Sequence, residues 1–356
     1  MLVVRPASIE DADKVYAFQL SHRLTALRPA AWRQFWLSCP FRTQFENIPL
    51  GWLLENGQQV VGVLGNVHML YELDARHLKA AITSGWLVDP EHRNGSLQLL
   101  NAYFQQKGID LWLSDTANAT TSKILTVLKV ERIPAPEYDA PLLWPIHTRA
   151  FASAGLRQRG VPAPGLLGLP VGAALKAVGW FKYRNERYPS QVHKVKFFDE
   201  RFDSLWDRIR AASVRLRAVR TSSILQWRFQ LELADGSAVI LVHGDDELQG
   251  YAVLLRNFRE HLRLTVSDVA DLQAVNDNPI VLKDLLLASM HVARERGADA
   301  LKFAGGQGTK RTVALSLRPY SYRTDDWQLF YRAAGSDLSA ALRSRELWDI
   351  SAFEMF

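Results

Sequence analysis

The alternation of apolar and polar positions at the start of the chain predicts one strand followed by two helices. Residues 2–5 alternate as a strand does, and Ser8 with two acids behind it is typical of a helix N-terminus, so a helix is expected through about Leu20. Aromatic residues within 32–36 recur with helical spacing after Pro29. This stripe predicts a second helix that packs on a core.

A three-stranded meander is expected after these helices. Its strands cover residues 51–54, 59–71 and 78–88. The first two are separated by Asn56-Gly57, and Asn-Gly between two apolar runs is a strong hairpin signal. The third strand leads into a short polar loop.

Apolar residues at helical spacing predict a helix over about 95–107 after that loop. Gly108 is expected to end it, since glycine is favoured directly after a helix. Its expected buried side chains are Leu97, Leu100 and Phe104. The other elements expected in this half are a strand at 111–113, a helix at 118–128, and closing strands at 130–133 and 140–146.

The hydrophobic pattern starts again near residue 191 and repeats the same order of elements. A helix is expected over 200–212, a second meander over 237–269 and a long helix from Pro279 to about Arg296. Further expected elements are strands at 192–198, 301–303, 328–331 and 347–350 and a helix at 309–317.

A short internal correspondence indicates that the halves are related. Residues 107–113, Lys-Gly-Ile-Asp-Leu-Trp-Leu, end one helix and open a strand. Residues 296–303, Arg-Gly-Ala-Asp-Ala-Leu-Lys-Phe, do the same with one residue more. Because each run follows a meander and a longer helix, we interpret the halves as a degenerate internal repeat.

Length and composition fit a two-domain globular protein. The chain has 356 residues, of which 48% are hydrophobic and 22% charged. Residues 150–179 are rich in Gly, Ala, Leu and Pro, and a small apolar helix is expected over 171–181. That helix is either packed or exposed at a domain interface or near a membrane. We therefore expect an N-terminal domain over 1–148, a linker over 149–190 and a C-terminal domain over 191–356.

Net charge and cysteine content restrict the class of partner. The net charge of +6 and the pI near 9.4 suit anionic ligands such as nucleotides or CoA, but the basic residues are spread out, so no nucleic-acid partner is expected. Cys39 is the single cysteine, and no His/Asp/Glu group has metal-ligand spacing, so neither a disulfide framework nor a metal site is expected. No segment has the pattern of a signal peptide or a membrane span, which favours the cytoplasm.

Residues 84–100 combine a strand, a short basic loop and an amphipathic helix. Free N–H groups at a helix start bind anions, Arg93 adds a positive charge, and Gly95 would let a phosphate approach the backbone. An ordinary strand–turn–helix connection with a solvated Arg93 has the same local features. The stretch by itself leaves both interpretations open.

The same stretch resembles the acyl-CoA pyrophosphate loop of the GNAT acyltransferases. Val88, Pro90, His92, Arg93 and Gly95 match that motif, although the loop is shortened and one glycine is absent. The order of elements also resembles the GNAT order. The resemblance implies an α/β (α+β) fold of two tandem GNAT-like acyl-CoA N-acyltransferase domains, each a mixed, mostly antiparallel central sheet flanked by helices. In that fold two central strands splay apart and bind the pantetheine arm.

The resemblance also implies a cofactor, acetyl-CoA or another acyl-CoA, and the residues that bind it. These are Leu87, Val88, Arg93, Asn94, Gly95, Ser96, Leu97 and Asn118. Leu97 has an alternative interpretation as a core residue. In the second half, the corresponding loop carries Asp268, Asp271 and Asp277, and acids there would repel a pyrophosphate. We therefore expect the second half to bind no CoA.

The catalytic residues are less well defined by the sequence. An amine must lose a proton and attack the thioester carbonyl while the thiolate leaves. The tyrosine that protonates the thiolate in the GNAT pattern falls on Leu125, so another group or water would have to replace it. The candidate general bases on the meander strands are His68, Glu72 and Ser84, although a lone His on a strand is more often structural.

These features predict an acyl-CoA-dependent N-acyltransferase with an amine acceptor, such as an amino sugar or sugar nucleotide. Residues 224–229, 250–254 and 347–351 resemble tandem GNAT-like proteins of bacterial exopolysaccharide clusters. Two alternatives stay open. The missing tyrosine favours a non-catalytic GNAT-like binding or regulatory protein, and the tandem architecture is shared, more distantly, with FemAB-like aminoacyl transferases.

Overall fold

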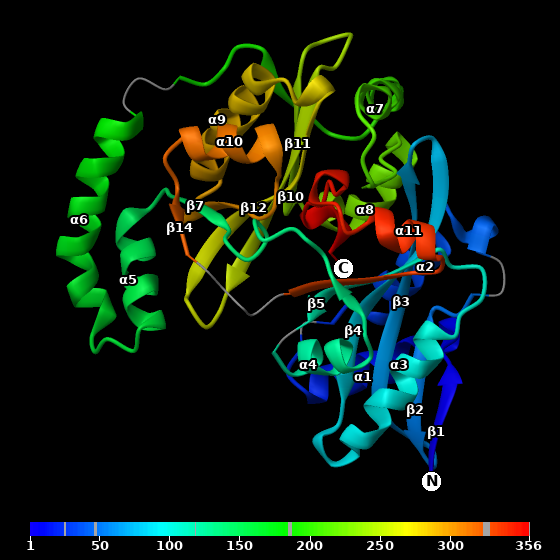
Figure 1. The fold of residues 1–356 in the computed structure, drawn as a ribbon. Helices are drawn as coiled ribbons and strands as arrows, with labels where there is room; N and C mark the ends of the chain where they lie inside the picture. Colours follow the sequence, from blue (N-terminus) through cyan, green and yellow to red (C-terminus); the bar gives the residue numbers. More distant parts are fainter. Residues whose placement is uncertain (25, 46–47, 118, 184–186, 323–327, 356) are drawn as a thin grey trace.

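The computed structural model describes residues 1–24, 26–45, 48–117, 119–183, 187–322 and 328–355. In these ranges the chain forms two mostly antiparallel sheets flanked by helices, with the second sheet above the first in Figure 1. The predicted fold class, a mixed sheet with helices in each half, is confirmed. No helix in the described ranges is long and apolar enough to cross a membrane.

The first sheet contains the predicted meander at its centre. Its strand order is β1 (Leu2–Pro6), β2 (Gly51–Asn56), β3 (Gln59–Leu73), β4 (Arg76–Val88), β5 (Leu111–Ala117), β15 (Gln328–Ala333) and β6 (Glu131–Arg132), with β9 (Arg217–Ala218) added at β3. The helices of this half are α1 (Ala12–Ser21), α2 (Pro29–Leu37), α3 (Ser96–Phe104) and α4 (Ala119–Val127), with 3-10 turns η1 (Ile9–Asp11), η2 (Arg42–Phe45) and η3 (Pro90–Gly95).

The second sheet repeats the meander in β10, β11 and β12. Its strand order is β14 (Tyr320–Ser321), β7 (Leu142–Pro145), β13 (Ala300–Phe303), β12 (Leu264–Ala274), β11 (Gly250–Arg259), β10 (Ala238–His243) and β8 (Val192–Val195). The remaining helices are α5 (Thr148–Gln158), α6 (Pro164–Tyr183), α7 (Glu200–Ala212), α8 (Ser222–Ala234), α9 (Pro279–Glu295), α10 (Gly308–Ser316) and α11 (Ser336–Ala341). The 3-10 turns of this half are η4 (Val275–Asp277), η5 (Arg345–Leu347) and η6 (Ala352–Glu354).

Among the described residues, the second sheet contains one strand from the first half of the sequence, and the first sheet contains two from the second half, the short β9 and β15. β7 lies in the second sheet, where Trp144 pairs with Leu301, and β15 lies in the first sheet, where Tyr331 pairs with Leu113. Figure 1 shows β15, the orange-red strand that leads to α11, beside β5. The domain limits predicted near residues 148 and 190 stay a prediction, and the exchange adds that neither sheet is complete without the other half.

Helices α1 and α3 cover opposite faces of the first sheet. Val15 of α1 packs on Leu53, whereas Gly95 at the start of α3 packs on Leu54. Neighbouring residues of a strand point to opposite faces, so the two helices are separated by the sheet. The loop after β4 therefore crosses the sheet edge to reach the face opposite α1.

The two halves share one hydrophobic core. The rings of Phe35 in α2 and Trp227 in α8 stack with centroids 4.8 Å apart, and the Trp227 indole N–H donates to the Phe35 carbonyl at 2.8 Å. Buried residues of both meanders, including Leu54 and Val253, belong to the same cluster. The predicted packing role of the aromatic stripe in α2 is observed, and its partner is the second half of the chain.

Two local predictions were wrong. Leu97 was expected to be buried, but its side chain is 54% exposed, because the face of α3 that packs on the core carries Leu99, Leu100 and Tyr103. Residues 347–350 were expected to form a strand, but the segment contains the end of η5 and a single bridge between Trp348 and Leu216. Both segments contain buried apolar residues, as predicted. In the first the predicted buried face was wrong, and in the second the predicted element was wrong.

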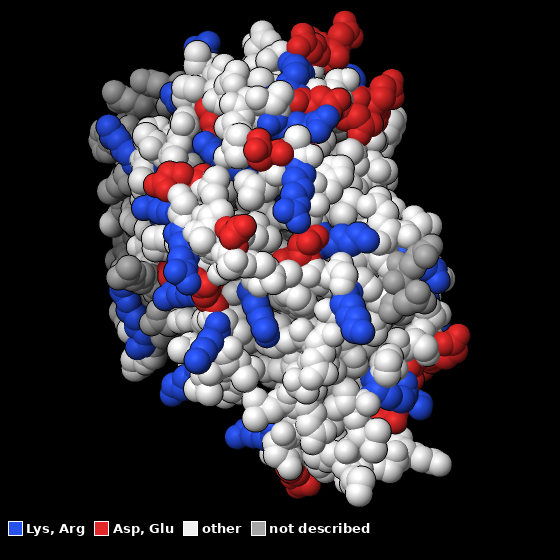
Figure 2. Space-filling view, turned by 45° about the vertical axis from the view of Figure 1, so that its right-hand side comes forward, with Lys and Arg blue, Asp and Glu red and all other residues white. Residues whose placement is uncertain are grey.

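Charged side chains are mixed over the surface. On the face drawn in Figure 2, Lys and Arg alternate with Asp and Glu and do not form one continuous basic block. The expectation that the protein has no nucleic-acid partner stays a prediction.

A buried ion network joins the C-terminal segment to the second sheet. The Arg220 guanidinium donates to Asp271 at 2.9 Å and to Glu354 at 2.8 Å, and the Tyr251 hydroxyl donates to Asp271 at 2.6 Å. Arg220 is 1% exposed and Asp271 is fully buried, so the charges compensate one another without water contact. The network fixes η6 on β12.

Replacing Arg220 by methionine is expected to lower the free energy of unfolding by about 3–5 kcal/mol, because Asp271 and Glu354 would stay buried without their cationic partner. The matched control is Arg343→Met, since the Arg343 side chain is 70% exposed and pairs with Glu131 at the surface. Its expected loss is much smaller, because solvent screens an exposed ion pair. Urea unfolding followed by circular dichroism compares the two, and equal losses would contradict this role of the network.

Candidate functional site

Strands β4 and β5 separate in the middle of the first sheet. They pair in parallel only from Ala80–Leu111 to Ile82–Leu113. Beyond this point β4 continues to Val88 along β3, while β5 continues along β15. The backbone of β4 from residue 83 onward therefore has no described ladder partner on the β5 side.

Tyr103 of α3 closes the point where the strands separate. Its hydroxyl lies 2.6 Å from the Ala81 carbonyl oxygen and 2.9 Å from the Leu113 carbonyl oxygen, so it can donate to either strand. On the next residue pair, the Thr83 hydroxyl donates to the Ser114 hydroxyl at 3.2 Å. Tyr103 is 1% exposed, and these bonds fix where the opening begins.

The loop after β4 presents charged and polar side chains of both signs at the start of α3. Glu91, Arg93 and Asn94 are exposed, Ser96 is half-buried, and no side chain caps the start of the helix. The Ser96 N–H donates to the Arg93 carbonyl of η3, and the anion site expected from a helix start beside an Arg stays a prediction. The exposed position of Leu97 places it beside this surface and not in the core.

Gly95 is required by packing. Its φ of −73° is ordinary for any residue, but a Cβ there would lie 2.2 Å from Leu54 Cδ2. The absent side chain lets the start of α3 lie directly on β2. Packing on Leu54 is a different reason for glycine at position 95 from the close approach of a phosphate that the sequence predicted. Either reason places the start of α3 near the end of β4.

The predicted base candidates lie in three different environments. His68 is 6% exposed, stacks on Phe45 at 4.9 Å, and has Nε2 at 3.0 Å from the Asn66 side-chain amide. Burial lowers the pKa of His68 to about 4, so its ring is neutral at pH 7. Glu72 is also 6% exposed and lies 3.4 Å from Arg210, away from the opening.

Ser84 is the base candidate that lines a pocket beside the opening. The predicted cofactor residues Leu87 and Val88 are half-buried at the end of β4, where they pair with Val63 and Gly62. Asn118 lies outside the described residues. The structure thus brings Ser84 and the cofactor loop to the same strand and separates them from His68 and Glu72.

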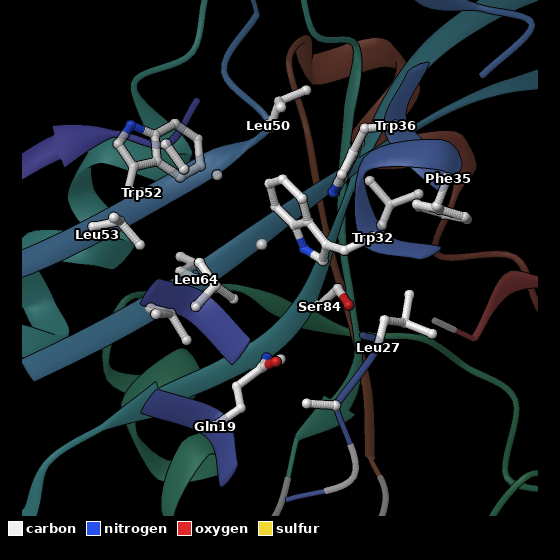
Figure 3. A pocket seen from close by; sticks show the side chains of 18 of the residues that line it. Gln19, Leu27, Trp32, Phe35, Trp36, Leu50, Trp52, Leu53, Leu64 and Ser84 are labelled. Atoms are coloured by element: carbon white, nitrogen blue, oxygen red, sulfur yellow. The ribbon is translucent and has the colours of Figure 1, made fainter. Parts of the chain in front are cut away.

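The pocket has a volume of about 360 Å³ and lies between α1, α2, the meander strands and α8. Figure 3 shows Trp32, Leu64 and Ser84 around one space, with Gln19 reaching in from α1. Most of its wall is apolar, and α8 of the second half supplies Glu232. A pocket of this size, largely apolar with a few polar groups, is typical of a small-molecule site.

A bulge in the sheet opens the pocket towards β4. The register of β3 with β4 shifts between Val63 and Gly65, and Gly85 has a φ of +57°, a conformation that favours glycine. At Gly65 a Cβ would lie 2.7 Å from the Ser84 carbonyl oxygen. The pocket was not predicted from the sequence, but glycines at 51, 65 and 85 in neighbouring strands were a usable signal.

The corresponding opening in the second sheet is filled by side chains. β12 pairs with β13 only up to Val269–Phe303. Beyond it, Asp271 belongs to the network of Arg220, and Gln273 accepts from Lys310 at 2.9 Å. These contacts are compatible with the expectation that the second half binds no CoA, which stays a prediction.

Comparisons with known proteins relate the fold to N-acyltransferases. No protein-family profile and no curated protein match the sequence. Among solved structures, Saccharomyces cerevisiae N-myristoyltransferase with bound myristoyl-CoA is similar with a TM-score of 0.59 and 10% identity, over 93% of this chain and 83% of that one. A GCN5-related N-acetyltransferase from Anabaena variabilis gives 0.58 and 12%, over 94% and 73%.

A probable N-acyltransferase from Enterococcus faecalis is similar with a TM-score of 0.56 and 9% identity, over 94% of this chain and 72% of that one. All three alignments span both halves of the chain. At these identities the comparisons show the fold alone, which is GNAT-like.

Replacing Tyr103 by phenylalanine is expected to lower the free energy of unfolding by about 1–3 kcal/mol, because a buried donor to two strands is lost. Amide exchange near Ile82 and Leu113 is expected to become faster. Tyr16→Phe, a half-buried tyrosine of α1, serves as control with an expected change within about 0.5 kcal/mol. Unchanged exchange at the branch point in Tyr103→Phe would show that the hydroxyl does not hold the strands there.

Proposed function

We propose that the protein is an acyl-CoA-dependent N-acyltransferase whose donor binds at the opening between β4 and β5. The separation of these strands after Ile82 and Leu113 is the observation that carries the proposal. The stretch of β4 beyond this point, which includes Leu87 and Val88, would bind the pantetheine arm. The pyrophosphate would bind at the start of α3, with Arg93, Asn94, Gly95, Ser96 and Leu97 around it and Asn118 as a further contact.

The chemistry needs few protein groups. Holding an amine against the thioester carbonyl converts a bimolecular step into one within a complex, and a general base removes the amine proton as the thiolate leaves. Ser84 lies at the junction of opening and pocket and is a candidate to bind or relay that proton. His68 and Glu72 would need a rearrangement to reach it.

Glu232 is a further candidate for the general base. It is the one carboxylate in the described pocket lining, its side chain is 30% exposed, and Arg228 lies 3.6 Å away. A carboxylate can accept the amine proton directly or through one water. Since Glu232 comes from α8, catalysis would then depend on both halves of the chain.

The identity of the acyl group and of the acceptor belongs to this proposal. Acetyl-CoA is the simplest donor, and the apolar wall of the pocket also supports larger acyl groups. An amino sugar or sugar nucleotide as acceptor, in polysaccharide synthesis, rests on the sequence resemblance alone. A FemAB-like use of aminoacyl-tRNA rests on the tandem architecture and would show itself as dependence on charged tRNA.

One observation favours a non-catalytic binding role. Leu125, at the position of the expected tyrosine, is 1% exposed and packs in a small cluster with Leu100 and Phe330. No proton donor therefore comes from that position. Binding of CoA without acyl transfer over a broad panel of amines would support this second candidate.

Saturating acetyl-CoA, dodecanoyl-CoA or free CoA is expected to raise the melting temperature, because each would bind the folded state. Arg93→Ala is expected to weaken binding by about tenfold or more through loss of a charge-assisted contact. The control is Arg76→Ala, whose side chain is 72% exposed at the far end of β4. The absence of a shift in melting temperature with all three ligands would contradict the proposed donor site. The relative sizes of the three shifts report the acyl-group preference.

Glu232→Gln is expected to lower kcat by about one hundred- to ten-thousandfold while CoA affinity stays the same, because the amide cannot accept the amine proton. Steady-state kinetics with an amine from the panel that the unaltered protein acylates measure the change in kcat. Ser84→Ala tested in parallel separates the two candidates. An unchanged kcat in Glu232→Gln would remove Glu232 as the base.

A further inference from the structure

Helices α5 and α6 form an antiparallel pair at the edge of the second half, visible at the left of Figure 1 and far from the first sheet. The inner helix, α5, attaches to the body through Ala154, which packs with Leu264 and Val266. The Arg157 guanidinium also donates to the Leu262 carbonyl. The outer helix, α6, lies on α5.

The contact between the two helices is a glycine seam. A Cβ on Gly168 would lie 2.1 Å from Ser153 Oγ, and one on Gly172 would lie 2.7 Å from Arg149 Cα. Residues four apart share one side of a helix, so both glycines face α5. Close approach through glycines fixes α6 against α5 while burying little of its apolar surface.

The rest of the described part of α6 is apolar and uncovered. Leu166 is 71% exposed, Leu167 and Leu169 are each 47% exposed, and Val171 is 42% exposed. Leu166, Pro170, Ala173 and Ala177 recur at helical spacing on the side away from the seam, and all four are exposed. An apolar helix with this much exposure is typical of a surface that contacts a membrane or a partner.

The charge around this helix favours one kind of contact. Residues 140–185 contain six Lys or Arg and no Asp or Glu. Arg149, Arg159 and Lys176 are exposed on the helix pair. A second copy of the chain would bring the same positive charges together, whereas anionic lipid headgroups complement them.

We propose that α5 and α6 dock the protein on the surface of an anionic lipid bilayer. In this arrangement α6 lies in the plane of the interface, with Leu166 and Leu167 among the acyl chains and Arg159 and Lys176 at the headgroups. The proposal rests on the helix pair alone and is independent of acyl transfer.

Co-sedimentation of the full chain with vesicles tests this. We expect binding to vesicles of phosphatidylcholine and phosphatidylglycerol in equal parts, much weaker binding to phosphatidylcholine alone, and weakening by salt. Leu166→Glu/Leu167→Glu is expected to lower the partition coefficient by more than about tenfold. Arg159→Glu/Lys176→Glu is expected to lower the partition coefficient by at least about fivefold for each charge.

Leu315→Glu is the matched control, since Leu315 is 50% exposed on α10, and it is expected to bind as the unaltered chain does. Melting temperatures of all variants verify folding. Failure of the unaltered chain to bind the anionic vesicles would overturn the proposal. So would equal binding by the leucine double variant, or a dimer in solution that this variant alone makes monomeric, which would assign the surface to a second copy.

Discussion

The structure of the first half depends on the point where β4 and β5 separate. Two neighbouring parallel strands normally continue to pair, because unpaired buried backbone groups are unfavourable. Here β5 pairs with β15 on its other edge. Where β4 and β5 separate, the Tyr103 hydroxyl lies within hydrogen-bond distance of a backbone carbonyl of each strand. Backbone groups at the start of the separation therefore have hydrogen-bond partners. The stretch of β4 beyond it, which has no described ladder partner on the β5 side, is where we propose that the donor binds.

That geometry requires both halves of the chain. β15 comes from the second half, and α8 of that half packs through Trp227 on α2 and supplies Glu232 to the pocket. The second sheet, in return, contains β7. Although the halves repeat one fold, the contacts have diverged. The Arg220 network and Lys310 fill the second opening, whereas Tyr103 and the bond between Thr83 and Ser114 lie at the start of the first.

Local sequence signals predicted most elements. Pro279 at the first helical position, after Asn278 as N-cap, placed the start of α9, and Asn56-Gly57 placed the first hairpin. The predicted burial of Leu97 is wrong because α3 faces the core with Leu99, Leu100 and Tyr103. Periodicity identifies a helix, but the face that is buried depends on how the helix packs on the sheet.

The sequence by itself determined the order of the elements, the repeat and the polar loop at the start of α3, since these depend on neighbours a few residues apart. The tertiary structure alone decided that β7 and β15 change sheets, that His68 is buried and neutral, and that a pocket adjoins Ser84. The physical reason is that strand partners, desolvation and cavities arise from contacts between residues far apart in the chain, which local patterns do not encode.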